Sequence, residues 1–396
     1  MKIIGIDDSK KEIRKINKKK ITYAIIITTI FIIFLTLFCI YVGNRNFRDF
    51  IDKYVLMKNV KEDNLLSITL NDNENNNVYA YDKYISVLNK NVLTGYNSNA
   101  NKEYELTVEI TNPIVDTNNR FLLLAEKSGQ KIYLISGENV VWEKKLDGNI
   151  TKISVNKNGY VSVILSGTSY KSVIETYDET GKLLFKTYLS STIAMDSAIS
   201  NDNKYLSFVE ISANGTLIQS TIKTVSIQKA KEQPSESIIY IGNSKKDSIA
   251  LSLKYQDSNK LICMYDNEID IINNNEEEKI LDLIEDGKKI GFSDIRLNNF
   301  VFRVTERSNL LNTKTILEIM NPTNKKINQY EIDGVIKEAY CYKDTIALNL
   351  GSEVHFVGTN GWLIKKYTSS QELKNIVIND SSIGIVYKDK VEIINL

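Results

Sequence analysis

The hydrophobic pattern divides the chain into one uninterrupted apolar segment near its start and a long region of short apolar runs. The segment from Ile21 to Val42 reads ITYAIIITTIFIIFLTLFCIYV and holds 22 residues without a charge. As a helix rising about 1.5 Å per residue it extends about 33 Å, enough to cross a hydrocarbon core of about 30 Å. A helix also satisfies every backbone polar group of the segment internally. We therefore expect residues 21–42 to form a single transmembrane helix in the lipid bilayer.

The charges that flank this segment predict its orientation. Residues 1–20 hold eight Lys and Arg, whereas four follow the segment within a similar distance. Because basic residues favour the cytoplasmic side, we expect a basic cytoplasmic tail and an extracytoplasmic C-terminal domain in the cell membrane. A cleaved signal peptide is the alternative, but the run exceeds the usual length of about 7–15 residues and no A-x-A-like site follows. A lipoprotein would use Cys39, but the bulky Phe38 precedes it where a small residue is needed.

Residues 43–62 form a juxtamembrane linker or short helix. Apolar residues at Phe47, Phe50, Ile51 and Val55 have the spacing of one face of an amphipathic helix. This face can lie on the lipid surface or pack under the domain that follows, and the spacing does not decide between the two.

From residue 63 to residue 396 the apolar runs shorten and alternate with Asn- and Gly-rich turns, which is the pattern of β-strands. Pairs of strands around a tight turn recur, for example SVNKNGYVSVI at 154–164 and AISNDNKYLSFV at 198–209. Asn, Asp and Gly fit these turns because they tolerate positive φ. A third strand follows each pair, and a fourth closes most units, as in SGENVVWEKKL at 136–146.

The repeat predicts an all-β fold, a β-propeller of eight blades with seven as the alternative, preceded by the single transmembrane α-helix. The third strands recur every ~37 to 50 residues, which is close to the repeat length of propellers. Each four-stranded unit has two apolar faces and buries them by stacking radially against its neighbours. The last unit lacks a fourth strand, so we expect the early strand Leu65–Leu70 to complete it and to hide the sheet edges.

Composition and charge narrow the classes of partner. Apolar residues make up 42% and charged residues 25%, as in a globular chain. Outside residues 1–20 there are 42 basic and 46 acidic side chains, so the domain lacks the basic excess that a nucleic-acid partner requires. Cys263 and Cys341 fall in non-adjacent units, so we expect no structural disulfide.

Motifs for catalysis, metals and cofactors were sought, and none is expected. The only histidine, His355, lies in an expected strand and is interpreted as a packing residue. It cannot by itself form a metal cluster, and no cysteine pair has zinc spacing. There is no G-x-S-x-G elbow, Walker A loop or G-x-G-x-x-G turn. Trp142 and Trp362 follow Gly turns, where we expect them to dock neighbouring blades.

The candidate binding surface is the propeller face that carries the turns between second and third strands. These turns comprise residues 126–130, 166–171, 212–216 and 306–309. They contribute Tyr170, Lys171, Asn214 and Arg307 as candidate partner-binding residues, of which Tyr170 and Arg307 are the expected anchors because Tyr and Arg are enriched at interface hot spots.

Several segments resemble a family of membrane-anchored bacterial proteins that is known mainly from clostridia and catalogued only as a domain of unknown function. They are VYAYDKYISVLNKNVLTGYN (78–97), ISVNKNGYVSVI (153–164), AISNDNKYLSFVEISANGTLIQSTIKTVSI (198–227) and ICMYDNEI (262–269). The resemblance covers nearly the whole chain, and it implies no activity and no site residues.

The sequence therefore predicts a non-catalytic binding or scaffolding platform at the bacterial cell surface, with a protein or a cell-wall-associated partner. The alternative is a cell-envelope enzyme that acts on a wall sugar or small metabolite through carboxylates on the propeller face. A carboxylate cluster with shifted pKa values near the central channel would favour the enzyme, because propellers host many unrelated activities and the fold does not decide.

Overall fold

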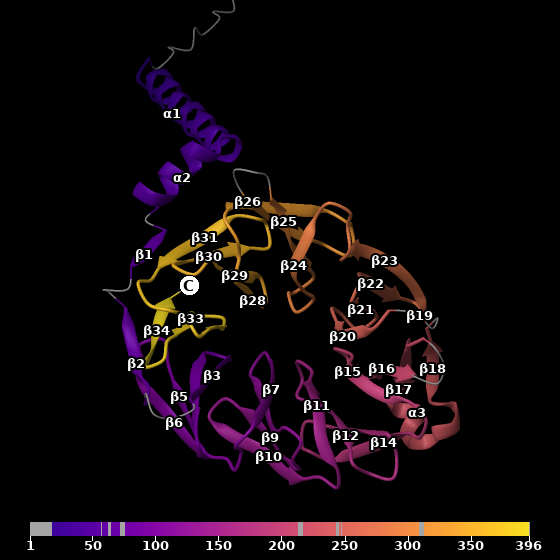
Figure 1. Cartoon of the computed structure of the whole chain (residues 1–396). Coiled ribbons are helices and arrows are strands. Elements are labelled where there is room, and N and C mark those ends of the chain that lie inside the picture. The colour runs from indigo at the N-terminus through magenta and orange to yellow at the C-terminus, as the bar shows by residue number, and fades with distance from the viewer. Residues whose placement is uncertain are drawn as a thin grey trace, which may run out of the picture. The chain divides into compact units, whose positions relative to one another are not determined.

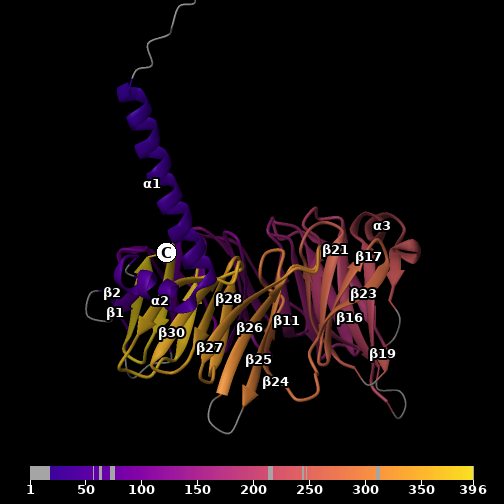
Figure 2. The same cartoon turned by 90° about the horizontal axis from the view of Figure 1, so that it is seen from above.

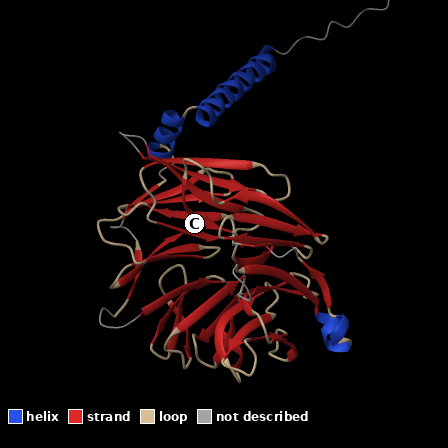
Figure 3. Ribbon diagram, turned by 45° about the vertical axis from the view of Figure 1, so that its right-hand side comes forward, coloured by secondary structure: helices blue, strands red, loops and turns tan. Residues whose placement is uncertain are grey.

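The structure, a computed structural model, describes residues 18–56, 58–61, 65–71, 76–212, 217–242, 245–246, 248–308 and 313–395. The chain divides into two compact units, residues Met1–Asn59 and Val60–Leu396. Each unit is described by itself. Strands dominate the chain, and the helices are few (Figure 3).

The first unit contains two helices, α1 (Lys18–Gly43) and α2 (Arg45–Tyr54). Residues Thr22–Gly43 of α1 are long and apolar enough to cross a membrane, a property that an N-terminal signal sequence shares. Asn44 ends the first helix and caps the second, because its side chain accepts a hydrogen bond from the Phe47 N–H.

Three side chains close the elbow between α1 and α2. The Tyr41 hydroxyl donates to the Asp52 carboxylate at 2.6 Å, and Lys58 Nζ lies 2.9 Å from the same carboxylate. Asp52 is buried by these contacts, whereas Phe50, Val55 and Leu56 on the same helical segment stay exposed. The amphipathic helix expected within residues 43–62 is thus present, with apolar side chains available for contact.

The second unit is an eight-bladed β-propeller, as the repeat predicts. In each blade the strands run antiparallel from the centre outward and are called here strands A, B, C and D (Figure 1). Blades 1 to 4 comprise β3 (Asn76–Tyr81), β4 (Tyr84–Asn89), β5 (Val92–Tyr96) and β6 (Lys102–Thr107); β7 (Pro113–Asn118), β8 (Phe121–Glu126), β9 (Lys131–Ser136) and β10 (Asn139–Lys145); β11 (Asn149–Val155), β12 (Val161–Ser166), β13 (Ser172–Tyr177) and β14 (Leu183–Leu189); and β15 (Ile193–Ile199), β16 (Tyr205–Ser212), β17 (Gln219–Ser226) and β18 (Ile238–Ile241).

Blades 5 to 8 repeat the same order. They comprise β20 (Ala250–Tyr255), β21 (Lys260–Tyr265), β22 (Glu268–Asn273) and β23 (Glu276–Asp282); β24 (Lys289–Asp294), β25 (Val301–Ser308), β26 (Thr313–Met320) and β27 (Ile327–Asp333); β28 (Glu338–Tyr342), β29 (Thr345–Asn349), β30 (Glu353–Gly358) and β31 (Leu363–Thr368); and β32 (Asn375–Ile378), β33 (Ser382–Val386), β34 (Lys390–Asn395) and β2 (Leu66–Thr69).

The ring closes as expected, because β2 pairs with β34 as the outer strand of blade 8. Leu66 lies opposite Ile393 and Ile68 lies opposite Val391 in this register. Blade 8 is thus assembled from both ends of the domain, which gives it the same four strands as the other blades and joins it to blade 1.

Some elements depart from the four-stranded repeat. The short β1 (Asn59–Lys61), where the second unit begins, adds a fifth strand beside β31. Blade 4 carries α3 (Ile227–Glu232) and a 3₁₀ helix (Pro234–Glu236) between its C and D strands, and β19 (Lys245–Lys246) pairs with β17. No repeat pattern in the sequence predicts these additions.

Turns leave the blades on two opposite faces (Figure 2). The AB face carries the turns between strands A and B and between C and D. The BC face carries the turns between B and C and the links from one blade to the next. Most A–B turns use Asn, Asp, Lys or Gly residues at positive φ, such as Asn119 and Asn203.

The core lies between the blades, in a series of apolar clusters that each join neighbouring sheets. Strand β8 illustrates the cause: its residues Phe121 to Ala125 are all buried because both faces of the sheet are covered by other blades. Trp142 of blade 2 packs against Tyr177 of blade 3, with ring centroids 5.8 Å apart, and approaches Gly181 of the same blade. Trp142 therefore docks neighbouring blades, as expected, whereas Trp362 remains 38% exposed.

Candidate functional site

A cavity of about 820 Å³ occupies the centre of the propeller. All eight blades contribute to its wall, through their A strands or the residues that follow them, together with A–B turn residues such as Asn156 and Lys157. Its volume falls within the range of about 300–1,000 Å³ that is typical of small-molecule sites. The cavity therefore belongs to the AB side of the ring, and none of the described B–C turn residues lines it.

β-bulges turn polar side chains toward this cavity. In blades 3, 4 and 5 the register of the A strand shifts by one residue near its start, at Thr151, Met195 and Leu251. The residue after each bulge, Lys152, Asp196 and Ser252, lines the cavity. Bulges commonly re-aim side chains near sites in this way.

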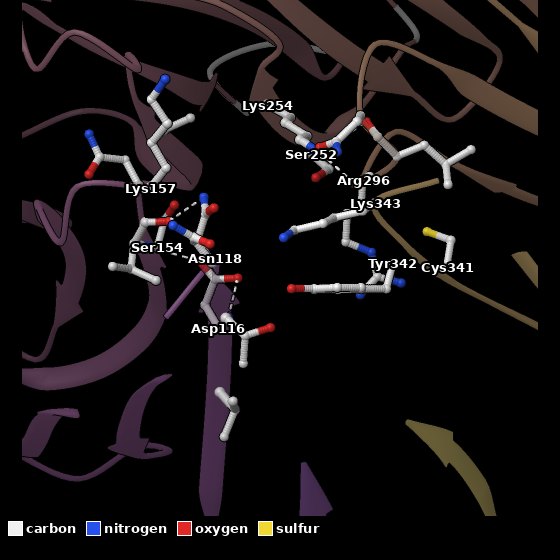
Figure 4. A pocket seen from close by; sticks show the side chains of 18 of the residues that line it. Asp116, Asn118, Ser154, Lys157, Ser252, Lys254, Arg296, Cys341, Tyr342 and Lys343 are labelled. Atoms are coloured by element: carbon white, nitrogen blue, oxygen red, sulfur yellow. Dashed lines mark hydrogen bonds between the residues drawn. The ribbon is translucent and has the colours of Figure 1, made fainter. Parts of the chain in front are cut away.

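The polar residues gather on two sides of the cavity (Figure 4). The side formed by blades 2 and 3 presents Asp116, Asn118, Ser154 and Lys157, and the side formed by blades 5 to 7 presents Ser252, Lys254, Arg296, Cys341, Tyr342 and Lys343.

Asp116 and Asp196 join neighbouring blades by accepting hydrogen bonds from backbone N–H groups. Asp116 Oδ2 accepts the N–H of Val155 in blade 3 at 2.8 Å, and its Oδ1 accepts the Thr117 N–H. Asp196 Oδ2 accepts the N–H of Leu253 in blade 5, also at 2.8 Å. Burial, with the charge of Asp196 nearby, raises the pKa of Asp116 to about 6, although the amide bonds and Lys152 oppose the shift. Burial likewise raises the pKa of Asp196.

The opposite side is rich in hydrogen-bond donors. Lys254 Nζ donates to the backbone carbonyls of Arg296 and Leu297, at 2.5 and 3.0 Å. Arg296 binds Asp294 through Nε and Nη2, at 2.8 and 2.6 Å from Oδ2. Burial lowers the pKa of Lys254, although the charges of Asp294 and Asp116 oppose the shift.

Tyr342 and Lys343 continue this side toward the A–B turns. Lys343 Nζ lies 2.6 Å from Asp380 of blade 8 and 5.4 Å from the centre of the Tyr342 ring. The Tyr342 hydroxyl is buried without a hydrogen-bond partner in the described part of the chain, and so is the side-chain nitrogen of Gln256. Buried donors of this kind are costly, so they mark a place where a bound group or solvent would be stabilising.

The residues expected at the binding surface lie elsewhere. Tyr170 and Lys171 are exposed on the B–C turn of blade 3, and Arg307 is exposed near the end of β25 in blade 6. Blades 4 and 5 separate Arg307 from the other two, so the structure does not bring these anchors into one cluster. Asn214 lies outside the described residues. Whether any of these residues binds a partner stays a prediction.

Tyr170 instead belongs to a group of exposed apolar side chains on the BC face of blades 3 and 4. The rings of Tyr170 and Tyr188 lie 4.7 Å apart between centroids. Ser172 Oγ accepts the Ala194 N–H, which holds this loop against the start of β15, where Ile193 and Met195 are exposed. Exposed fractions are 41% for Tyr170, 53% for Tyr188, 51% for Ile193 and 39% for Met195. These four residues are called here the Tyr170 cluster.

His355 has the packing role expected from the sequence. It is 5% exposed in β30, 3.1 Å from the Tyr330 hydroxyl and 3.2 Å from Glu353. Among the described residues, no group of three or more His, Cys, Asp or Glu side chains is arranged to hold a metal ion. Cys39, Cys263 and Cys341 are free thiols, and burial raises the pKa of Cys341 at the cavity wall.

Sequence reasoning missed the cavity residues. A signal was present. The first strands contain a polar residue between apolar ones, as in ISV (153–155) and LKY (253–255), and IRL (295–297) repeats this pattern directly after the first strand of blade 6. The second strands, in contrast, are nearly all apolar. That alternation indicates a strand with one solvent-exposed side, and in a propeller the innermost strand has this property because it faces the central channel. It does not indicate which charged residues share a side of the cavity, because that depends on blade number.

Solved structures similar to this one are propellers. Sqt1 of Chaetomium thermophilum, bound to the N-terminus of the ribosomal protein L10, is 11% identical, with 84% of this chain and 100% of that chain covered at a TM-score of 0.50. BamB of Moraxella catarrhalis is 12% identical over 83% and 95% of the two chains at a TM-score of 0.49. At such low identity the likeness concerns the fold alone.

Sequence comparison assigns the family but no activity. No curated protein matches the sequence. Residues 57–396, which include the whole propeller, match a family whose function is unknown. The chain therefore belongs to the family of unknown function DUF5711.

Proposed function

We propose that this protein is a membrane-anchored binding platform without catalytic activity. In this proposal α1 crosses the membrane with its N-terminus in the cytoplasm, and the propeller lies on the extracytoplasmic side of a bacterial cell. There it binds a protein or a cell-wall-associated partner. The uncharged span Thr22–Gly43 of α1 and the excess of basic residues before it support the anchoring and the orientation.

The Tyr170 cluster is the observation that carries the binding role. Four large apolar side chains stay exposed together on one face, whereas most large apolar side chains of the propeller are buried between blades. Tyrosine pairs are favoured at protein interfaces because each ring buries a large area at a small cost in side-chain entropy. Sqt1 provides a precedent for a propeller that holds a protein segment, but the proposal stands on the surface of this chain.

The proposal is tested by cross-linking the full-length protein in native membranes and identifying what co-purifies. The variant Tyr170→Ser/Tyr188→Ser should lose the partner. The matched control is Ile327→Ser, which removes a side chain that is 44% exposed on the AB face of blade 6. Loss of the partner in the tyrosine variant alone supports the proposal. A partner that both variants retain, or no partner at all, overturns it.

The enzymatic alternative draws on Asp116 and Asp196. These two carboxyls line the central cavity and both have raised pKa values, which is a common property of catalytic acids and bases. Their backbone hydrogen bonds account equally well for their burial. Hydrolysis of a wall sugar or small metabolite that Asp116→Asn abolishes would favour the enzyme over the platform, provided that Asp270→Asn, outside the cavity, retains it.

A further inference from the structure

The central cavity has an uneven distribution of charge. On the side of blades 5 to 7 it presents three cationic groups, Lys254, Arg296 and Lys343. Two of them already have carboxylate partners, since Arg296 binds Asp294 and Lys343 binds Asp380. Lys254 is the exception, because its ammonium group is held by two backbone carbonyls and by no carboxylate of the described residues.

This arrangement costs free energy in the empty cavity. A cation taken out of water is stabilised by a nearby anion far more than by neutral carbonyls. Burial lowers the pKa of Lys254, and the charges of Asp294 and Asp116 oppose this shift only in part. Two further residues of the cavity wall have unused donors, since the hydroxyl of Tyr342 and the side-chain nitrogen of Gln256 are buried without partners in the described chain.

The geometry of Arg296 leaves one edge of its guanidinium available. Asp294 occupies Nε and Nη2, and no bond from Nη1 is found among the described residues. Lys254 Nζ touches the backbone oxygen of this same residue. Lys254 and Arg296 therefore belong to the same side of the cavity wall, and Lys and Arg side chains together bind carboxylates and phosphates in many sites.

We propose that the central cavity binds a small oxyanion-bearing molecule, a carboxylate or a phosphate, on the Lys254–Arg296 side of its wall. The site is on the AB side of the ring, away from the Tyr170 cluster, so it does not depend on the binding platform. The volume of about 820 Å³ accommodates a molecule much larger than the anion itself, so the rest of the ligand would face the amide and hydroxyl groups opposite.

Asp116 opposes such a ligand. Its carboxylate acts electrostatically on both Lys254 and Arg296 from the facing wall. Removing its negative charge should strengthen anion binding, whereas removing the charge of Lys254 should weaken it. If Lys254 only joined blade 5 to blade 6 through the two carbonyls, neither Asp116→Asn nor the loss of the Lys254 charge would change ligand binding.

The test is calorimetric titration of the full-length protein in nanodiscs of zwitterionic lipid, with empty nanodiscs as the blank. Inorganic phosphate and citrate are the two probes, so that a preference for phosphate or for carboxylate can be recognised. The variants are Lys254→Gln, which keeps a donor for the carbonyls, Arg296→Gln and Asp116→Asn. The control Lys325→Gln removes an exposed lysine of blade 6 that lies outside the cavity.

Saturable binding of one probe is expected, weakened roughly tenfold by Lys254→Gln or Arg296→Gln. Asp116→Asn should tighten it roughly threefold, and Lys325→Gln should leave it unchanged. Thermal unfolding of each variant shows whether it is folded, and Asp116→Asn keeps the test decisive if Lys254→Gln is not. Absence of binding by both probes overturns the proposal, as does binding that all three cavity variants leave unchanged.

Discussion

The C strands and the A strands of the blades both withdraw charged side chains from water, but they do so differently. In five C strands the withdrawn residue is bound by other side chains. The partners lie within the same blade for Glu175 and Glu318, and partly or wholly in a neighbouring blade for Asp270, His355 and Glu392. Glu175 illustrates the type, since it lies 2.5 Å from Lys186 of the adjacent D strand and accepts a hydrogen bond from Tyr177.

In the A strands the charged residues contact other blades or the cavity. Asp116 and Asp196 bind backbone amides of a neighbouring blade, and Lys254 binds backbone carbonyls of the next one. The cavity lies on one side of these side chains, so the protein does not surround them completely. The pKa of Asp116 rises to about 6 and that of Lys254 falls, which shows that burial outweighs the stabilising contacts of both.

The difference separates charges that stabilise the fold from charges that are available to a ligand. A charge that other side chains enclose is largely satisfied before any ligand arrives, whereas a charge in the A strand faces the cavity on one side. Asp270 is intermediate, because burial raises its pKa to about 6 even though Lys245 contacts it. The four predictions below test this separation.

The largest effect is expected for Arg303→Ala in blade 6. Arg303 is 7% exposed and binds Glu318 at 2.6 Å, Glu285 at 3.1 Å and the Asp282 carbonyl at 2.6 Å. Its removal leaves Glu318 buried without a cation, so the free energy of unfolding should fall by about 3–5 kcal/mol. Urea unfolding followed by tryptophan fluorescence measures this loss.

The control is Arg307→Ala on the same strand, where the side chain is exposed. It should change the free energy of unfolding by less than about 0.5 kcal/mol. If both variants lose the same amount, the enclosed charges of the C strands are not what stabilises the blade.

A smaller loss is expected for Glu175→Gln. The amide keeps an acceptor for the Tyr177 hydroxyl but loses the charge that binds Lys186. Hydrogen bonds to charged groups contribute about 1.5–3 kcal/mol, so we expect a loss of about 2 kcal/mol in the same unfolding assay. In a protein that already carries Lys186→Met, the further change Glu175→Gln should cost much less stability than it does in the wild-type protein. The ion pair is already absent from the Lys186→Met protein, so the second change has no pair to break.

Asp116→Asn should act in the opposite direction. The pKa of this carboxyl rises from 3.8 to about 6 on folding, so between these values the folded state binds more protons than the unfolded state. The stability of the wild-type protein should therefore fall as pH rises from about 4 to about 6. The variant lacks this contribution and should be more stable at pH 7.

We expect a gain of about 1 kcal/mol, less than the full shift of roughly two pKa units implies, because the amide cannot accept both backbone N–H groups. Urea unfolding at several pH values between about 4 and 7 measures it. A loss of stability at pH 7, with the pH dependence unchanged, would place Asp116 with the enclosed charges of the C strands.

The sequence predicted the parts of the fold that depend on local pattern. Alternating runs and Asn/Gly turns located the strands, and an orphan strand at Leu65–Leu70 with an incomplete last repeat predicted the closure. The helices and the extra strand of blade 4 interrupt the repeat, so the periodicity of the sequence does not predict them. The cavity residues depend on which blades face each other across the ring, which no local pattern encodes. Tyr170 was predicted from residue type alone, and its neighbours Tyr188, Ile193 and Met195 come from two other strands.

The smallest effect is expected at the cavity mouth, where Lys343 and Asp380 join the A–B turns of blades 7 and 8 at 2.6 Å. Their side chains are 33% and 50% exposed, so water and salt screen the pair and its coupling should be below about 1 kcal/mol. A double-mutant cycle with Lys343→Gln and Asp380→Asn, measured at low and at high ionic strength, should show a coupling that disappears in high salt. A coupling of several kcal/mol that persists in high salt would mean that charges at the cavity are as tightly enclosed as those of the C strands. The charges at the cavity could then no longer be distinguished from the charges that stabilise the fold, and they would not be available to a ligand.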